Sequence, residues 1–263
     1  MPAADSLCIT IVQTDIRWEE KEANLQHYTR LISGIQDEKE IIVLPEMFST
    51  GFSMAPERLA EDMSGPTLQW MKDTARAQRV ILTGSLIIED EGRYFNRLVW
   101  MQPDGEFRCY DKRHLFGYAD EDAHYSGGSK KLITQVKGWR ICPLICYDLR
   151  FPVWARNAPG SEYDVLLYTA NWPERRSLAW KTLLQARAIE NQAYCIGVNR
   201  IGEDGKGIAY SGDSSAFDPL GGLIWQSSHK EAVHTVKLNR QMLEDTRSHF
   251  PFLRDADKFL ITE

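Results

Sequence analysis

Long apolar runs and an excess of positive charge are both missing from this sequence. None of its apolar runs approaches the roughly 18 residues that a membrane-spanning helix needs. Its 31 basic residues are outnumbered by 37 acidic ones, which gives a formal net charge of −6, and the basic residues form no block. Proteins that hold a nucleic-acid backbone usually carry an excess of basic residues. We therefore expect neither a membrane protein nor one that binds nucleic acid.

Cysteines are few and show no pairing pattern. There are five, at positions 8, 109, 142, 146 and 195, and none has the C-x-x-C spacing. An odd set without that spacing suits a reducing compartment better than a disulfide framework. Residues 1–7 include Asp5 and no basic residue, unlike a secretory signal. The expected location is the cytoplasm.

Short motifs for several common chemistries are also absent. The sequence contains neither of the phosphate-binding patterns G-x-x-x-x-G-K-[ST] and G-x-G-x-x-G. It has no G-x-S-x-G motif for a serine nucleophile. Its six histidines do not pair with cysteines or carboxylates at the spacing of metal ligands. We therefore predict that the protein uses no metal and no cofactor.

Short apolar runs alternate along the whole chain with longer amphipathic stretches. The apolar runs predict strands at 7–12, 41–44, 80–88, 93–101, 107–110, 132–136, 139–145, 165–169, 194–199, 214–217, 223–226 and 232–238. The turn residues Pro103-Asp104-Gly105 predict that 93–101 and 107–110 form a hairpin. The amphipathic stretches predict helices from residue 18 to about 35, at 67–78, near 152–158 and at 177–192, the last with Leu178, Leu183, Leu184 and Ile189 on one side. Strands mixed with helices that could cover two faces indicate a layered α/β protein. No shift in composition marks a boundary, so we expect one domain over residues 1–263.

Glu46 is the first residue whose position suggests chemistry. It follows the apolar run Ile41–Leu44 and Pro45 directly. A carboxylate at the end of a buried strand is costly unless it is paired, and strand ends are where α/β folds place ligands. The alternative is a solvated residue that opens the loop from Met47 to Pro66, and the sequence favours neither.

Lys112 occupies a similar place after the expected strand 107–110. Its neighbours Asp111 and Arg113 favour a charged cluster on the surface. A lysine held against a carboxylate and a thiol would instead be a fixed positive charge that stabilises an anionic transition state.

Cys146 ends an apolar run at which the sequence turns polar, in ICPLICYDLR. At such a strand-to-turn switch a nucleophile can stand above a sheet, with the next backbone N–H, that of Tyr147, directed at a developing oxyanion. A cysteine that acts as a nucleophile needs a base or a positive neighbour at neutral pH. The alternative is a small buried apolar residue, which describes Cys8, Cys195 and in our interpretation Cys142 better.

Three segments together resemble the nitrilase superfamily of carbon–nitrogen hydrolases: LPEMF around Glu46, YDKRHLF around Lys112 and PLICYDLRFP around Cys146. The resemblance extends from QTDI near the first strand to FDPLGG late in the chain. It implies a four-layer αββα sandwich, a homodimer or higher homo-oligomer, and a catalytic set of Glu46, Lys112 and Cys146. In that set Glu46 serves as the base, Cys146 as the nucleophile, and Lys112 with the Tyr147 N–H holds the oxyanion. The segment from about 247 to 263 is then a tail or a dimer arm.

Many members of this superfamily carry a second glutamate in the loop after the lysine. Here that loop reads GYADEDAHYSGG, and Glu121 is the matching candidate. Asp120 and Asp122 flank it, and three adjacent acids would repel one another in a closed site. We expect one of the three to point inward, and Glu121 is our choice.

The KRHLF and CYDLRFP strings, together with Asn171-Trp172-Pro173, are most similar to the omega-amidase branch. That branch hydrolyses the terminal amide of short 2-oxo dicarboxylic acid monoamides, such as 2-oxoglutaramate and 2-oxosuccinamate, to the acid and ammonia through a cysteine thioester. The far carboxylate of such a substrate needs a positive partner, for which the candidates are Arg150, Arg175 and Arg176. Phe48, Phe52, Phe116 and Trp172 are candidates for apolar walls or for plain core.

Other functions stay open on the sequence. The chain could be another amidase of the same superfamily, acting on a carbamoyl amine, an aliphatic amide or a nitrile. It could also be a non-catalytic binding module, although the three key residues are intact. A cysteine–histidine hydrolase would need a histidine near Cys146, and no motif identifies one.

Overall fold

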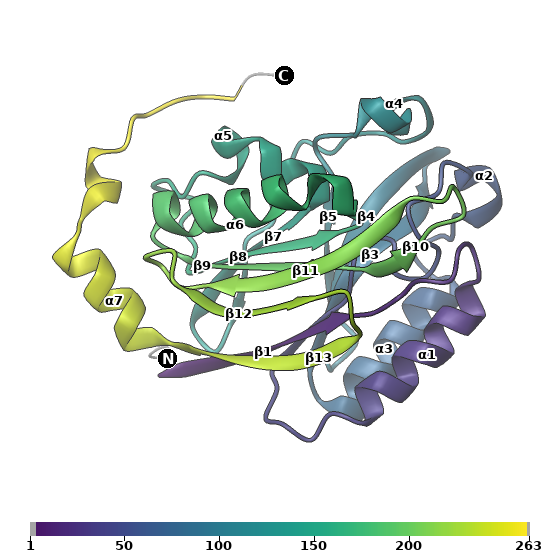
Figure 1. Ribbon diagram of the computed structural model, residues 1–263, viewed down its shortest axis with the longest axis horizontal. Coiled ribbons are helices and arrows are strands. Elements are labelled where there is room, and N and C mark those ends of the chain that lie inside the picture. Colours follow the sequence, from purple (N-terminus) through teal and green to yellow (C-terminus); the bar gives the residue numbers. More distant parts are fainter. Residues whose placement is uncertain (1–3, 262–263) are drawn as a thin grey trace.

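Two β-sheets lie face to face in the computed structural model, which describes residues 4–261. The first sheet has the strand order β13-β1-β2-β3-β4-β5, and the second has the order β10-β11-β9-β8-β7-β6, with β12 paired to β11. Figure 1 shows α1 and α3 outside the first sheet and α6 outside the second. The layers therefore run helix, sheet, sheet, helix, which is the αββα sandwich that the resemblance implies.

The first sheet is built from β1 (Ser6–Gln13), β2 (Ile41–Val43), β3 (Ile81–Asp90), β4 (Arg93–Met101), β5 (Phe107–Asp111) and β13 (Ala232–Asn239). Strands β1, β2 and β3 are parallel. Strands β4 and β5 then follow as antiparallel neighbours, so β5 again points the same way as β2. The hairpin that the turn at Pro103-Asp104-Gly105 predicts is confirmed.

The second sheet is built from β6 (Thr134–Val136), β7 (Trp139–Ile145), β8 (Val165–Ala170), β9 (Tyr194–Asn199), β10 (Ile201–Glu203), β11 (Ala209–Phe217) and β12 (Leu223–Ser228). Strands β7, β8 and β9 are parallel and fully buried apart from β7's Arg140. Continuous apolar runs are typical of strands covered on both faces. Strand β11 begins five residues before the predicted 214–217, because its first half pairs with β10, which the sequence did not predict.

Three apolar clusters separate the four layers. One lies between α1 (Lys21–Ser33), α3 (Pro66–Gln78) and the first sheet, and contains Tyr28, Ile32 and Met71. A second fills the space between the sheets with side chains such as Ile9 and Leu167. The third lies between the second sheet and α6 (Ser177–Asn191). Burial of these faces is the main force that holds the layers together.

The predicted apolar side of the long helix at 177–192 is wrong in part. Leu184 is buried, but Leu178 and Ile189 are 78% and 51% exposed. The buried face of α6 is instead Trp180, Leu184, Arg187, Ala188 and Asn191. These positions follow the three-and-four spacing of one helix face, whereas Leu178 and Leu184 lie on different sides. The helix predicted near 152–158 is also shorter, as α5 (Pro152–Ala155).

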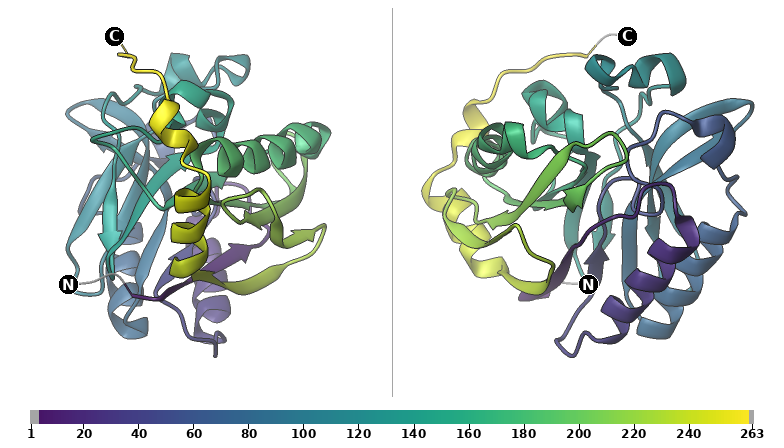
Figure 2. Two further views of the ribbon diagram at one scale, coloured as in Figure 1. Left: turned by 90° about the vertical axis from the view of Figure 1, so that its left-hand side faces the viewer. Right: turned by 45° about the vertical axis from the view of Figure 1, so that its right-hand side comes forward.

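The C-terminal part of the chain forms α7 (Arg240–His249), which the sequence did not predict. Arg240 and Arg247 both form ion pairs with Asp164, which fixes α7 to the second sheet. Figure 2 shows α7 and the segment after it running along one side of the molecule. The predicted tail from about 247 thus begins inside a helix, and residues 262–263 lie outside the described part.

Four short strands end at the same edge of the sandwich. The carboxyl ends of β2 and β5 in one sheet meet those of β7 and β8 in the other, because the parallel strands of both sheets point toward this edge. The residues that follow these strands are separated widely in sequence but adjacent in space. Among the helices of residues 4–261, none has both the length and the apolar character to cross a bilayer.

Candidate active site

Glu46, Lys112 and Glu121 form a buried ionic cluster. The Lys112 Nζ donates to Glu46 Oε1 at 2.9 Å and to the two carboxylate oxygens of Glu121 at 2.8 and 3.0 Å. Both glutamates are 0% exposed and Lys112 is 1% exposed. The alternatives of a solvated Glu46 and a surface Lys112 are therefore wrong. A buried ammonium held by two carboxylates is a fixed positive charge in a medium that screens it little.

Two asparagines hold Glu46 in place. Asn96, on β4, donates from Nδ2 to Glu46 Oε1 at 2.8 Å and to Glu121 Oε1 at 3.2 Å. Asn171, after β8, donates its backbone N–H to Glu46 Oε2 at 2.8 Å and its side-chain amide to the Glu46 carbonyl. Both glutamate oxygens thus have donors, which a buried carboxylate requires.

Cys146 begins the turn that follows β7. Its φ of 41° lies in the left-handed region, which is uncommon for a residue with a side chain. The Cys146 Sγ lies 3.9 Å from the carbonyl oxygen of Asn171, the same residue that holds Glu46. Asn171 thus contacts both the Cys146 thiol and Glu46. The left-handed backbone conformation of Cys146 fits a functional position.

Asp148 ties the Cys146 turn to the Lys112 segment. Its Oδ2 accepts from the Ile145 N–H and the Tyr110 hydroxyl, at 3.1 and 2.7 Å. Its Oδ1 accepts from the backbone N–H and the ring Nδ1 of His114, at 3.1 and 2.8 Å. Because His114 is two residues from Lys112 and Asp148 is two from Cys146, this buried carboxylate fixes the two segments relative to each other.

Burial and charge shift the pKa values of the cluster in different directions. Burial raises the pKa of the Cys146 thiol well above its usual range, Glu46 raises it further, and Lys112 opposes both. Burial would lower the pKa of Lys112, but Glu121 and Glu46 together raise it. Burial, helped by Glu46, raises the pKa of Glu121 against the pull of Lys112. Burial and the neighbouring Glu46 therefore both favour the neutral thiol of Cys146 in the resting protein.

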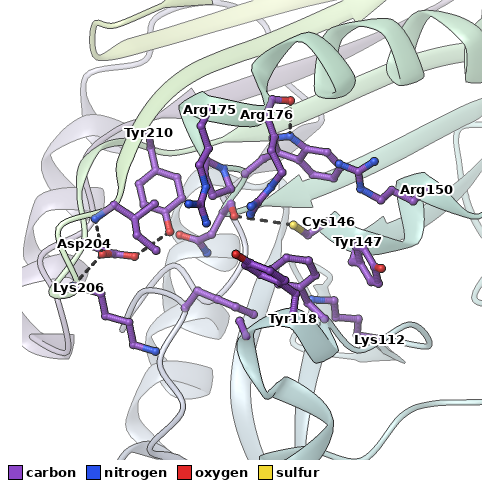
Figure 3. A pocket seen from close by; sticks show the side chains of 17 residues that line it. Lys112, Tyr118, Cys146, Tyr147, Arg150, Arg175, Arg176, Asp204, Lys206 and Tyr210 are labelled. Carbon is purple, nitrogen blue, oxygen red and sulfur yellow. Dashed lines mark hydrogen bonds between the residues drawn. The ribbon is translucent and has the colours of Figure 1, made fainter.

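A cavity of about 180 Å³ opens directly onto Cys146 (Figure 3). Phe52, Phe116 and Trp172 supply apolar surface, while Tyr147 and Lys112 lie at the Cys146 end. Basic side chains line it as well. These are Arg150, Arg175, Arg176 and Lys206. The mixture of apolar walls and a few charged groups is typical of a small-molecule site.

The structure brings together most of the residues that the sequence singled out. Glu46, Lys112, Glu121 and Cys146 share one site, and the cavity is lined by every residue predicted as a substrate or oxyanion contact: Tyr147, Arg150, Trp172, Phe116, Arg175 and Arg176. Asp120 and Asp122 are exposed, so Glu121 is the acid that points inward. Phe48 is the exception, because it is 0% exposed and packs edge-on against Tyr28 beneath the first sheet.

Sequence reasoning missed several residues of the site. Asn96 gave a signal that could have been used, since it is a polar residue inside the apolar strand YFNRLVWM, and a buried amide needs partners. Asp204, Lys206 and Tyr210 gave none, because they belong to the β10–β11 hairpin that the sequence did not predict. Within residues 4–261, no cluster of three or more His, Cys, Asp or Glu side chains could hold a metal ion.

Comparison with known proteins places this fold and site in a family. A model of the carbon–nitrogen hydrolase family matches residues 8–248. A crystal structure of XC1258 from Xanthomonas campestris, described as a CN-hydrolase superfamily protein, superimposes with a TM-score of 0.95 and 40% identity, over 98% of this chain and 100% of that one. The chain belongs to the carbon–nitrogen hydrolases, which form the nitrilase superfamily.

Two curated relatives narrow the class further. The chain is 44% identical to the omega-amidase YafV of Escherichia coli strain K12, over 96% of this chain and 98% of that protein. It is 30% identical to the 2-oxoglutaramate amidase of Bacillus subtilis strain 168, with coverage of 96% and 98%. It is therefore an amidase of the omega-amidase-like branch, and the non-catalytic alternative is wrong.

Proposed function

We propose that this amidase hydrolyses the terminal amide of short 2-oxo dicarboxylic acid monoamides, 2-oxoglutaramate and 2-oxosuccinamate, through a thioester on Cys146. The observation that carries the proposal is a thiol beside a buried Glu–Lys–Glu cluster, at one end of a cavity whose other charged groups are mostly cations. The names of the two curated relatives support the same substrate class.

In the first half of the reaction Glu46 takes the proton of the Cys146 thiol, and the sulfur attacks the amide carbonyl carbon. The carbonyl oxygen becomes an oxyanion, which Lys112 and the Tyr147 backbone N–H stabilise. Glu46 then returns the proton to the amide nitrogen, the C–N bond breaks, and ammonia leaves. The acyl group remains on Cys146 as a thioester.

In the second half a water molecule enters the space that ammonia vacated. Glu46 removes a proton from this water, whose oxygen attacks the thioester carbon. Lys112 and the Tyr147 N–H hold the second oxyanion, which collapses and breaks the C–S bond. The sulfur recovers its proton from Glu46, and the product leaves as a dicarboxylate.

Glu121 supports this chemistry without a bond to the reacting atoms. It accepts two hydrogen bonds from the Lys112 ammonium and one from the Phe116 backbone N–H at 2.6 Å. These contacts fix Lys112 and the loop that carries Phe116 over the cavity. We propose that Glu121 positions Lys112 for the oxyanion.

The far carboxylate of the substrate would bind among the arginines of the cavity. Arg150 lies over the Trp172 ring at 4.9 Å, and Arg176 lies over the Phe116 ring at 5.1 Å. Figure 3 shows Arg175 and Arg176 beside each other above the cavity. A guanidinium supported on an aromatic face is well suited to a planar carboxylate.

Other amide substrates and another mechanism are less well supported. A carbamoyl amine or a simple aliphatic amide has no carboxylate to pair with three arginines. A cysteine–histidine mechanism needs a histidine in the cavity, and in the described part of the chain no histidine lines it. His114 instead binds Asp148 behind the Cys146 turn.

An ammonia-release assay over a panel of 2-oxo acid monoamides, carbamoyl amines, aliphatic amides and nitriles tests the proposal. We expect the 2-oxo dicarboxylic acid monoamides to give the highest kcat/KM. We also expect Cys146→Ala to abolish release, and acid-quenched mass spectrometry to find an acyl adduct on Cys146 in the unaltered protein only. Cys142→Ala, a buried cysteine in β7 of the same sheet, serves as the matched control and keeps turnover. Turnover by the Cys146→Ala variant would remove this residue as the nucleophile.

A further inference from the structure

The β10–β11 hairpin supplies the side of the cavity opposite Cys146. It contributes Asp204, Lys206 and Tyr210 to the lining. Figure 3 shows these three side chains across the cavity from Cys146 and Tyr147. A substrate whose amide lies at the sulfur would therefore extend toward this hairpin, and groups on carbon 2 would meet its side chains.

Positive charge dominates this part of the cavity. Arg150, Arg175, Arg176 and Lys206 line it, and none of the four forms an ion pair with a carboxylate within residues 4–261. Burial lowers the pKa of the Arg176 guanidinium, and repulsion by Arg175 and Arg150 lowers it further. Arg150, Arg175 and Lys206 are exposed and Arg176 is half-buried, so this cluster lies where the cavity opens. Unpaired cations there attract an anion and repel an ammonium.

Asp204 is the one acidic side chain that lines the cavity in the described part of the chain, and both of its oxygens already accept hydrogen bonds. Its Oδ1 accepts from the backbone N–H groups of Lys206 and Ile208, at 2.8 and 3.0 Å. Its Oδ2 accepts from the Tyr210 hydroxyl at 2.9 Å. The Asp204 residue is 8% exposed. A carboxylate in this state offers little to a ligand.

Tyr210 is held firmly in this arrangement. The guanidinium of Arg200, which is fully buried, lies 4.7 Å from the centre of its ring. Arg200 is itself fixed by the Asp15 carboxylate and by backbone carbonyl groups. Burial and the neighbouring Asp204 raise the pKa of Tyr210, so its hydroxyl stays protonated and remains a donor.

We infer that Tyr210 determines specificity: by donating to the Asp204 oxygen that the loop amides leave free, it competes with an ammonium group of the substrate for the one carboxylate that lines the cavity within residues 4–261. An amide whose carbon 2 carries an oxo group or hydrogen is then accepted, and the matching 2-amino acid amide meets cations without a compensating carboxylate. The inference rests on the proposed function, because it assumes that the carbon chain of the substrate extends from Cys146 toward this hairpin.

Loss of the Tyr210 hydroxyl should shift selectivity toward the ammonium substrate. Glutaramate and L-glutamine differ only by the ammonium at carbon 2, so the ratio of their kcat/KM values isolates its effect. In Tyr210→Phe we expect this ratio to move toward L-glutamine by about tenfold, mainly through KM, because a hydrogen bond to a charged group is lost from Asp204. In Asp204→Asn the ratio should not move toward L-glutamine, and the double variant should show none of the gain.

A matched variant tests whether the change in selectivity is specific to the Tyr210 hydroxyl. Tyr118→Phe removes another hydroxyl from the cavity lining, and since Tyr118 donates to no carboxylate within residues 4–261 the ratio should stay constant. Any of three results would overturn the inference. The ratio could stay unchanged in Tyr210→Phe, kcat/KM could change equally for both amides, or Tyr118→Phe could show the same gain for L-glutamine. Should Tyr210→Phe fail to fold by circular dichroism, a shift toward L-glutamine in Asp204→Asn would overturn it.

The test also separates this inference from the proposed function. In the Cys146→Ala background, thermal stabilisation by glutaramate and by L-glutamine reports binding without turnover. In that background, Tyr210→Phe should increase the stabilisation by L-glutamine relative to that by glutaramate. This result is expected even if the ammonia-release panel shows that the protein prefers another amide. Failure of 2-oxoglutaramate in that panel would thus count against the proposed function, while equal stabilisation by both ligands in every variant would count against the role of Tyr210.

Discussion

At Lys112, burial and ion pairing act in opposite directions. A lysine that is 1% exposed loses its hydration, which favours the neutral amine, but two buried carboxylates restore the charged form. Glu46 and Glu121 in turn depend on Lys112, since without it two negative charges would face each other in a closed space. The three residues are therefore one unit, and removal of any member changes the protonation of the others.

Lys112→Met keeps the volume of the side chain and removes its charge, so it should lower kcat by a factor of about a hundred to a thousand, the usual cost of losing an oxyanion donor. It should also lower the free energy of unfolding by about 3–5 kcal/mol, because breaking a buried ion pair leaves an uncompensated charge. Without the cation, a buried glutamate has a raised pKa in the folded state. The proton on this glutamate stabilises the folded variant at low pH, and this stabilisation disappears as pH rises through the raised pKa. The free energy of unfolding of Lys112→Met should therefore fall further below that of the unaltered protein near pH 8 than near pH 5.

Urea unfolding at both pH values and steady-state kinetics measure these effects. Lys137→Met is the matched control, because Lys137 pairs with Glu40 at 2.7 Å but is 52% exposed. An exposed pair contributes at most about 1 kcal/mol, and we expect little change in that variant. Normal turnover by Lys112→Met would remove Lys112 from the oxyanion site.

The sequence could predict which residue types carry the chemistry, but not their contacts. Glu46, Lys112 and Cys146 each follow an apolar run, and that position alone indicates a strand end. Glu121 could be chosen over Asp120 and Asp122 only through the resemblance. The decision between a solvated and a buried Glu46 depended on Asn96 and Asn171, which lie 50 and 125 residues further along the chain.

At the scale of elements, the turn after β7 matters most, because it sets the direction of the Cys146 side chain. The left-handed φ of Cys146 is held by the hydrogen bonds that Asp148 accepts from Ile145, Tyr110 and His114. The His114 ring adds a stacking contact with Phe151, with centroids 3.8 Å apart. Asp148 therefore acts as a positioning residue for the turn, without contact with the reacting atoms.

Asp148→Asn should disturb the turn while leaving the Glu–Lys–Glu cluster in place. An amide has one acceptor oxygen where the carboxylate has two, so the donors on one side lose their partner, at about 1–3 kcal/mol for each buried group left unsatisfied. A displaced nucleophile should also lower the rate of thioester formation by tenfold or more. Stopped-flow kinetics and thermal unfolding measure the two effects.

Asp73→Asn provides the comparison, since Asp73 lies on the exposed face of α3 and accepts only from Gln69. We expect it to behave like the unaltered protein. If Asp148→Asn lost stability but formed the thioester at the usual rate, Asp148 would be a structural residue with no effect on the position of Cys146.

Helix α6 shows where periodicity alone reaches its limit. Its existence and length were predicted within one residue from the amphipathic stretch at 177–192, and in the structure Gln192 ends the helix in a left-handed conformation. Its buried face was not, since Leu178 and Ile189 are apolar but exposed, whereas the polar Arg187 and Asn191 are buried. Arg187 donates to the Leu149 carbonyl and to Glu190, contacts that no helical pattern reveals.

At the scale of the whole molecule, the segment after α7 exposes more apolar surface than a monomer needs. Phe252 and Leu260 are 64% and 93% exposed, and Phe250, Phe259 and Ile261 are each more than 40% exposed. Apolar residues gathered in one exposed segment indicate a contact with another chain. We propose that this segment is the dimer arm of a homodimer, with a second copy of the chain as its partner.

A chain that ends at His249 should lose the dimer and keep its fold, because α7 stays anchored by the Arg240 and Arg247 ion pairs. Sedimentation velocity should show a dimer for the full chain and a monomer for the truncated one. Phe252→Ser should weaken the dimer, while Phe107→Ser, an equally simple change on β5 away from this segment, should not. A truncated chain that sediments as the full chain does would contradict the proposal.

The sequence by itself determined the elements that follow local rules. Apolar runs fixed most strands, three-and-four spacing fixed the long helices, and turn residues fixed the hairpin at Pro103–Gly105, because each depends on neighbours a few residues away. The one-domain organisation over residues 1–263 stays a prediction of that reading.

Only the tertiary structure decided the ionic state of the site and the shape of the cavity. Glu46, Lys112 and Cys146 meet because two sheets bring the ends of β2, β5 and β7 to one edge. The pKa values of these groups depend on burial and on charges far away in sequence. Electrostatic interactions act through space, whereas a sequence pattern records only distance along the chain.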